Sequence, residues 1–192
     1  MEPFTLAAVG AIALTEGIKF LYGQAGELLK GWRARKGAAE AGATAAVEDE
    51  PIRVELPPAA FQGSLQPVVV RYDALSRLEK DIKDLSKELA PYAGGFEDVD
   101  PADRGLLDRV DAMRLSLEAV LGQRLTFVGE SRPTSGSPVV VGEAVIKEIE
   151  GRVAGVRARM LAGGNVSGTV RADIVRPGGE AYGVDADVIG SP

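Results

Sequence analysis

The chain has no cysteine and no histidine among its 192 residues. Without cysteine it can form no disulfide, no thiolate metal site and no cysteine nucleophile. Without histidine it lacks the commonest general base and the usual metal ligand of proteins. Ser-His-Asp catalysis, Cys-His catalysis and the usual zinc sites are therefore excluded.

The sequence also lacks the short motifs that accompany phosphate binding and nucleophilic catalysis. It contains no G-x-x-x-x-G-K-[ST] loop, no G-x-G-x-x-G after an expected strand and no G-x-S-x-G elbow. The acidic clusters at 48–50 and 97–100 lack the glycine and the spacing of a calcium-binding loop. We therefore expect a protein that is not an enzyme, binds no cofactor or metal, and has no small-molecule substrate.

Charge and composition narrow the class of partner. The net charge of -6 has the wrong sign for general attraction to nucleic-acid phosphates, so we expect no nucleic-acid partner. Hydrophobic residues make up 45% of the chain and charged residues 26%, which is typical of a folded protein. No Lys or Arg precedes the first apolar stretch, as a secretory signal requires, so a cytoplasmic location is expected.

No uncharged run is long enough for a simple transmembrane helix. The longest near the N-terminus covers residues 3–15, whereas crossing the hydrocarbon takes about 20 residues. Extending that helix across a bilayer would bury Glu16 and Lys19, each at high cost.

Residues 4–32 carry apolar side chains at steps of three and four, which predicts a helix with one continuous apolar seam. Gly10, Gly17 and Gly31 recur beside this seam at multiples of seven residues, which indicates that another backbone approaches closely there. We expect a helix that docks onto a partner. The seam, our candidate interaction site, consists of Phe4, Ala7, Ala11, Leu14, Ile18, Leu21, Ala25, Leu28 and Trp32.

Two shorter apolar seams predict an antiparallel helical hairpin. The first helix of this hairpin is expected to begin at Asp73 as its cap and to stop at Pro91. The second is expected to have Asp100 as its N-cap and Gly122 just beyond its end.

The partner of the N-terminal helix stays open at this stage. It could be the chain's own hairpin, in a three-helix bundle, or a second copy or another protein, or a membrane surface. The apolar residues off the seam, Leu6, Val9 and Ile12, would be exposed in a simple bundle and favour a partner beyond the hairpin.

The last third of the chain contains a fourteen-residue repeat. The copies VRARML, VRADIV and VDADVI begin at Val156, Val170 and Val184, and a weaker copy, GEAVIK, begins at Gly142. Apolar and charged residues alternate within each copy, which predicts β structure, either an antiparallel meander or a short solenoid. We favour the meander because three or four copies are few for an independent solenoid. A helical spacing over 146–160 is a competing interpretation of the first part.

The charged residues of the repeat grade from basic through mixed to acidic along the chain. They neutralise one another if the copies lie side by side. Alternatively, the basic edge of one subunit meets the acidic edge of the next in a head-to-tail assembly. A solvated sheet face explains the same charges. These residues are Arg157, Arg159, Arg171, Asp173, Asp185 and Asp187.

One stretch of the repeat resembles a known class of coil. Residues 166–175 follow the pattern V-x-G-x-V-x-A-x-x-V, which resembles the coils of bactofilin-type β-helical filament proteins. The resemblance covers these residues alone, and we assign no family from it.

These patterns together predict an α+β fold: a long N-terminal helix, an antiparallel helical hairpin and a C-terminal β region of 14-residue repeats. We expect a docking or oligomerisation helix at 1–36, an acidic Ala/Gly linker at 37–51, short strands with the hairpin at 52–137, and the β region at 138–192. The predicted function is a non-catalytic interaction or assembly subunit that binds itself or another protein through its N-terminal helix, with the β repeats as a further contact. The alternative is a membrane-active effector whose N-terminal helix enters or lies on a bilayer, which adds peripheral membrane association to the cytoplasmic location.

Overall fold

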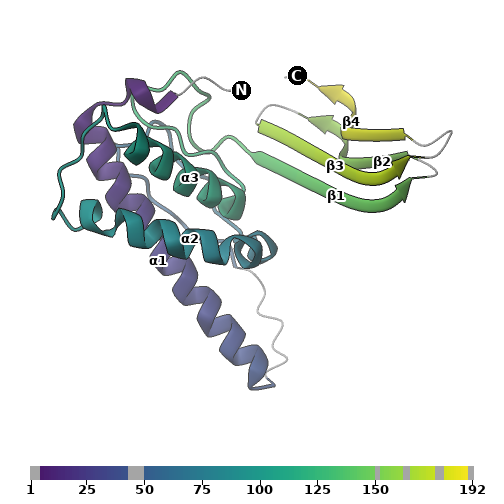
Figure 1. Cartoon of the computed structure of the whole chain (residues 1–192), viewed down its shortest axis with the longest axis horizontal. Helices are drawn as coiled ribbons and strands as arrows, with labels where there is room; N and C mark the ends of the chain where they lie inside the picture. Colours follow the sequence, from purple (N-terminus) through teal and green to yellow (C-terminus); the bar gives the residue numbers. More distant parts are fainter. Residues whose placement is uncertain (1–4, 43–49, 150–151, 162–164, 176–179, 190–192) are drawn as a thin grey trace. The chain divides into compact units, whose positions relative to one another are not determined.

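The chain divides into two compact units, which we call the helical unit (residues 1–136) and the strand unit (residues 137–192). A computed structural model of the chain describes residues 5–42, 50–149, 152–161, 165–175 and 180–189 (Figure 1).

The helical unit begins with a short 3-10 helix, η1 (Thr5–Ala8), and contains the α-helices α1 (Ala11–Glu40), α2 (Tyr72–Ala93) and α3 (Arg104–Leu121). Helix α1 packs against α2 and α3, and these two helices also pack against each other (Figure 1). The apolar seams of the three helices meet in one core, which the aromatic residues Phe61 and Phe127 complete from the connecting segments. The N-terminal helix therefore packs on the hairpin of its own chain.

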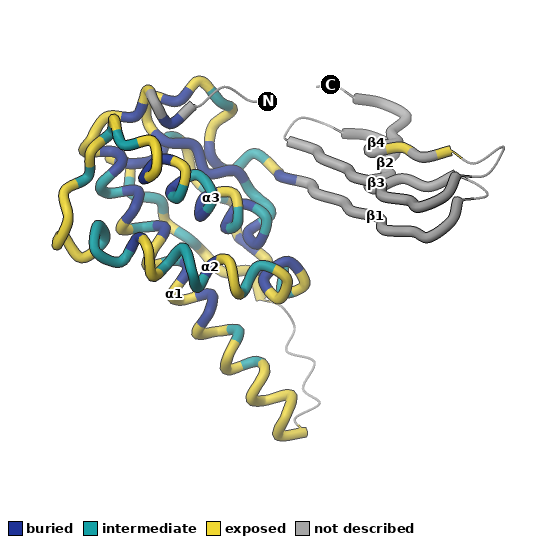
Figure 2. The backbone as a smooth tube through the Cα atoms, viewed as in Figure 1, coloured by how far each residue is buried: buried dark blue, intermediate teal, exposed yellow. Residues whose placement is uncertain are grey.

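Helix α1 is longer than the bundle that it belongs to. Its 30 residues span about 45 Å at 1.5 Å per residue. Beyond Lys36 its residues are exposed, and Figure 2 shows this end standing clear of α2 and α3. The expected boundary at residue 36 is wrong, because α1 continues to Glu40 through Ala38 and Ala39, the best helix formers.

The expected ends of the other two helices need partial correction. Helix α2 runs through Pro91 to Ala93, because a proline in the last turn removes few of the helix's hydrogen bonds. The N-cap of α3 is Asp103, whose carboxylate accepts a hydrogen bond from the Leu106 backbone N–H at 3.2 Å, so the prediction of Asp100 is wrong. Gly122 does follow the end of α3, with the left-handed backbone (φ 69°) that favours glycine.

The short strands expected in the helical unit are absent from residues 5–42 and 50–136, which the structure describes. This region forms isolated bridges instead, between Ile52 and Val68, between Phe61 and Phe127 and between Gly63 and Ser135. Prolines interrupt this region at positions 57, 58 and 67, and proline cannot donate a hydrogen bond to a strand ladder. The prediction of short strands beside the hairpin in residues 52–137 is therefore wrong for the described residues up to 136.

Glu79 of α2 joins that helix to α1. Its carboxylate accepts hydrogen bonds from Lys83 Nζ at 2.5 Å, Trp32 Nε1 at 2.8 Å and Lys36 Nζ at 2.9 Å. The hydrogen bonds from Lys83, Lys36 and Trp32, in that order, hold the pKa of Glu79 at about 2, against an ordinary value of 4.5. The Trp32 ring also stacks on Tyr72, with the ring centroids 6.0 Å apart. This cluster fixes the direction in which α1 leaves the bundle.

Replacing Glu79 by glutamine is expected to remove a pH-dependent part of the stability. Because the folded-state pKa lies below the unfolded one, the ionised carboxylate stabilises the fold above pH 4.5, and this contribution is lost as the pH falls towards 2. Urea unfolding can be followed by the fluorescence of Trp32, the one tryptophan of the chain. Above pH 5 the free energy of unfolding should be higher for wild type than for Glu79→Gln, and this gap should close as the pH falls. A gap that stays constant down to pH 2 would contradict this assignment.

The strand unit contains β1 (Val139–Ile149), β2 (Arg152–Leu161), β3 (Asn165–Val175) and β4 (Glu180–Ile189). Strand β1 pairs in parallel with β3, and β2 pairs in parallel with β4, which gives two two-stranded sheets. Consecutive strands contact each other without pairing, so the chain passes from one sheet to the other after each strand (Figure 1).

The predicted fold class is wrong. The helical unit is made of three α-helices and has no sheet among its described residues, and the described C-terminal strands are all paired in parallel, which excludes an antiparallel meander. Val139 lies opposite Asn165 and Arg152 opposite Glu180, so paired positions are 26 and 28 residues apart and not 14. One repeat of about fourteen residues therefore corresponds to one strand and the connection that follows it. Each strand pairs with the second strand after it in the chain, β1 with β3 and β2 with β4. The helical alternative for 146–160 is also wrong within the residues that the structure describes there, which belong to β1 and β2.

Candidate functional site

The predicted seam of the N-terminal helix is used within the chain. Its middle part lies in the core of the helical unit, where each side chain is at most 5% exposed; these residues are Leu14, Ile18, Leu21, Ala25 and Leu28. Trp32 is half-buried in the Glu79 cluster, and Ala11 is exposed. Ala7 belongs to η1, and Phe4 lies outside the described residues. The middle part of the seam is therefore covered by the chain's own helices.

The apolar residues off the seam are also largely accounted for. Leu6 is 1% exposed and Val9 is 3% exposed, whereas Ile12 is 77% exposed. Most of the apolar surplus that favoured a second copy or a bilayer is thus covered by the helical unit itself. None of the helices described by the structure combines the length and the apolar character needed to cross a membrane.

The glycines beside the seam fall into two kinds. Gly17 faces the ring of Phe127, and a Cβ atom at this position would lie 2.8 Å from Cζ and closer still to Cε1. Gly10 and Gly31 face open space, with nothing within 4 Å of a Cβ atom. A close approach explains Gly17, and the approaching group is a side chain rather than the backbone that we expected.

The charged residues of the repeat are brought together along the backbone of the strand unit. Arg157 of β2 lies directly opposite Asp185 of β4. Ala158 pairs with Ala186 and Met160 with Val188, and Arg159 and Asp187 stand between these pairs on their two strands. The basic copy and the acidic copy are therefore neighbours within one chain.

The mixed copy takes part in the other sheet. It forms β3, which contains Arg171 and Asp173, and pairs with the weak copy in β1. Arg171 lies opposite Val145 in this register. The strongest contrast of charge along the strand unit is thus between β2 and β4.

Each strand is paired along one edge. Among the described residues, no other strand pairs with the outer edge of β1, β2, β3 or β4. The strand unit therefore has a β1/β2 end and a β3/β4 end, and at neither end does a further described strand pair with the outer edge. Such edges are templates for pairing with another chain.

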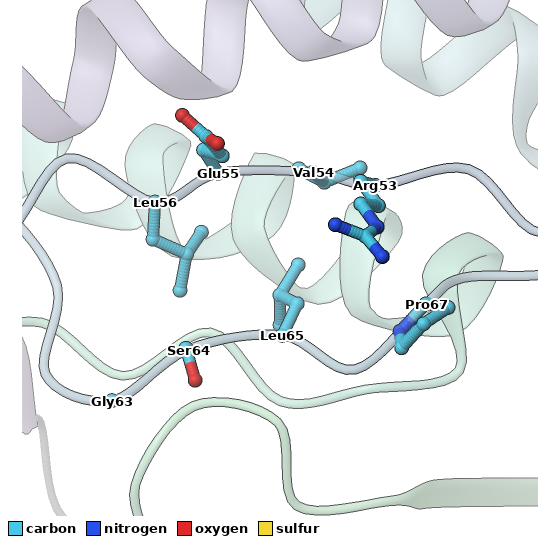
Figure 3. Close-up of a pocket in the computed structure, with 8 residues that line it drawn as sticks. All are labelled: Arg53, Val54, Glu55, Leu56, Gly63, Ser64, Leu65 and Pro67. Carbon is cyan, nitrogen blue, oxygen red and sulfur yellow. The ribbon is translucent and has the colours of Figure 1, made fainter.

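A cleft of about 490 Å³ opens in the helical unit between two extended segments, 53–56 and 63–67. Leu56 and Leu65 point into the space between these segments, and the guanidinium of Arg53 lies at the end near Pro67 (Figure 3). Glu55, the one carboxylate among the residues that line the cleft, points out of it (Figure 3). The cleft thus presents two apolar side chains and a cation, without paired groups for proton transfer, and we assign it no chemistry.

A buried group of charges joins α3 to the loop that follows it. Arg114 Nη1 donates to the two carboxylate oxygens of Glu130 at 2.7 and 2.9 Å, and Arg114 Nη2 donates to Asp111. Glu118 accepts from the Leu125 backbone N–H at 2.8 Å; burial raises the pKa of this carboxyl group, although that hydrogen bond opposes the rise. These contacts fix the loop against the helix.

This buried group of charges was not predicted from the sequence. The available signal was Arg114 and Glu118, four residues apart on the expected helix and adjacent to its apolar seam. The carboxylate partner Glu130 lies in a loop, where no periodicity marks it.

Comparison of the chain with protein-family models, with curated proteins and with solved structures gives no match.

Proposed function

We propose that the protein is a non-catalytic assembly subunit that associates with further copies of itself through the two ends of its strand unit. The observation that carries this proposal is the strand pairing: every described strand of this unit is paired on one side only, and all the pairs are parallel. In a head-to-tail assembly, the β3/β4 end of one copy receives the β1/β2 end of the next, and the parallel ladders continue from chain to chain.

The small size of the strand unit supports this proposal. Each of its sheets has two strands, whereas stacked repeats need about three units before they bury a stable core. Isolated two-stranded sheets are marginally stable in water. A second copy supplies the missing strands on both sheets at once, because the two open strands at one end meet two open strands at the other.

Charge favours a copy of this chain as the occupant. The outer strands of one sheet are β2, with Arg157 and Arg159, and β4, with Asp185 and Asp187. The register within the chain already places Arg157 opposite Asp185, and the same register across a junction brings the acidic strand of one copy to the basic strand of the next. Opposite charges across strands contribute about 0.2–1 kcal/mol for each pair.

A charge-swapped variant tests this junction without removing the pairing inside the chain. It combines Arg157→Asp, Arg159→Asp, Asp185→Arg and Asp187→Arg, so that β2 and β4 of the variant keep opposite signs. We expect wild type to mix with wild type and the variant with itself. A mixed junction would place like charges opposite each other, so we expect the two proteins to assemble separately.

Mixing can be followed by energy transfer between dyes, because the chain has no native cysteine. A cysteine introduced by Glu40→Cys, on the exposed end of α1, takes the donor dye in one sample and the acceptor dye in the other. Transfer in both like mixtures and a several-fold loss in the unlike mixture would support the junction. Equal transfer in all mixtures would refute its charge pairing, and no transfer in wild type would refute the assembly.

A further inference from the structure

We infer that the helical unit limits the length of the assembly, so that the protein forms short oligomers and not long filaments. This inference rests on the proposed function, since it concerns how many copies can join end to end. It follows from three lengths: the width of the helical unit, the rise that each copy adds to the stack, and the tether between the two units.

The helical unit is much wider than the stretch of stack that belongs to it. A compact unit of residues 1–136 has a radius of gyration of about 14 Å and is therefore at least about 35 Å across. Each copy adds two strands to each sheet, and neighbouring strands are about 4.8 Å apart, so one copy occupies about 10 Å along the stack. A stretch of stack as long as one helical unit is wide would therefore contain the strands of three further copies, each with a helical unit of its own.

The tether between the units is short and stiff. The helical unit ends at Gly136 and β1 begins at Val139, which leaves Ser137 and Pro138 to connect them. This connection reaches about 10 Å when extended, and the ring of Pro138 fixes one of its backbone angles. Helical units on two or three neighbouring copies can fan apart on such tethers, but the next unit finds no room. We therefore expect assemblies of about two or three copies.

Lengthening the tether tests this inference in the full chain. We would insert a flexible Gly/Ser segment of about 20 residues between Gly136 and Ser137, which lets the helical units spread far from the stack. The matched control carries the same insertion between Glu97 and Asp98, in the exposed connection of α2 and α3 and beyond the backbone hydrogen bonds that close the end of α2. Light scattering at equal concentrations gives the mean mass of each assembly.

The expected result is a several-fold higher mean mass for the tether variant than for wild type, with the control close to wild type. Equal masses for an oligomeric wild type and the tether variant would overturn the length limit, as would long filaments of wild type, and both results would leave the proposed self-association standing. If wild type and both variants were monomers, the proposed function itself would fail. If the mean mass rose equally in the tether variant and in the control, added flexibility anywhere in the chain, and not the length of the tether, would control the size of the assembly. That result would also overturn the inference.

Discussion

Replacing Glu130 by alanine is expected to destabilise the helical unit by about 3–5 kcal/mol, because it leaves a buried cation without its main partner. Arg114 and Glu130 have side chains that are 4% and 0% exposed, and they share two hydrogen bonds. The Phe127 backbone N–H also donates to Glu130, at 2.7 Å. The variant would therefore lose the acceptor of a buried N–H group as well. Urea unfolding followed by Trp32 fluorescence measures the loss, since Trp32 lies in this unit.

Two further variants separate burial from charge in this experiment. Glu88→Ala removes a half-exposed carboxylate that lies 4.0 Å from Arg109, and it should cost at most about 1 kcal/mol. The double variant Arg114→Met with Glu130→Leu removes both charges together and should recover the part of the lost stability that comes from the unpaired cation, while the Phe127 N–H stays without its acceptor. A loss in Glu130→Ala as small as that in Glu88→Ala would contradict the buried pairing.

The second large effect is expected at Gly17, where alanine should destabilise the helical unit by about 2 kcal/mol or more. The added Cβ atom would overlap the ring of Phe127. That ring cannot easily move, because it is fully buried and packs on Phe61 with the centroids 4.6 Å apart. Overpacking of a core costs about 1–3 kcal/mol, and occasionally more, which exceeds the gain of about 0.5–1 kcal/mol from replacing a helical glycine by alanine.

Gly23 provides a matched control on the same helix. A Cβ atom at this position would meet nothing within 4 Å. Gly23→Ala should therefore show the helix propensity alone and stabilise the unit by about 0.5–1 kcal/mol. The two substitutions are chemically identical and are predicted to have opposite signs. If both stabilised the unit, the close approach of Phe127 to α1 would be refuted.

The sequence was sufficient to find the three helices of the helical unit. Apolar seams at steps of three and four predicted α1, α2 and α3, and the left-handed Gly122 marked the end of α3. The start of α3 was harder to place, because Asp100 and Asp103 are both good N-cap residues. The carboxylate of Asp103 accepts from the Leu106 N–H within the helix, whereas that of Asp100 accepts from the Ala102 N–H before it. Local chemistry therefore gave the elements, and the choice between neighbouring caps depended on how the chain entered the bundle.

Partners distant in the sequence could not be predicted in this way. Alternation in the repeat has the same period in parallel and antiparallel sheets, so it could not show that β2 pairs with β4 and skips β3. Nor could it show that Phe127, from a loop, covers Gly17, or that Glu130 pairs with Arg114. The apolar seam indicated that α1 packs against other helices, and α2 and α3 of its own chain are its neighbours. The sequence could not distinguish these helices from a second copy, because the choice depends on packing between distant segments.

The strand unit, and not the N-terminal helix, is thus the surface on which our account of self-association depends. In this account the helical unit is a folded body carried by each copy, and the ends of the strand unit join the copies. The proposed junction brings the acidic strand β4 of one copy to the basic strand β2 of the next. It should therefore weaken at about 1 M salt, where charges are screened over about 3 Å.

Sedimentation velocity of the full chain over a range of concentrations tests the central claim most directly. Our account predicts a species of 20.1 kDa at low concentration and assemblies of a few copies as the concentration rises, with a shift back towards the single chain in 1 M salt. A single species of 20.1 kDa at every concentration, both in low salt and in 1 M salt, would contradict our account.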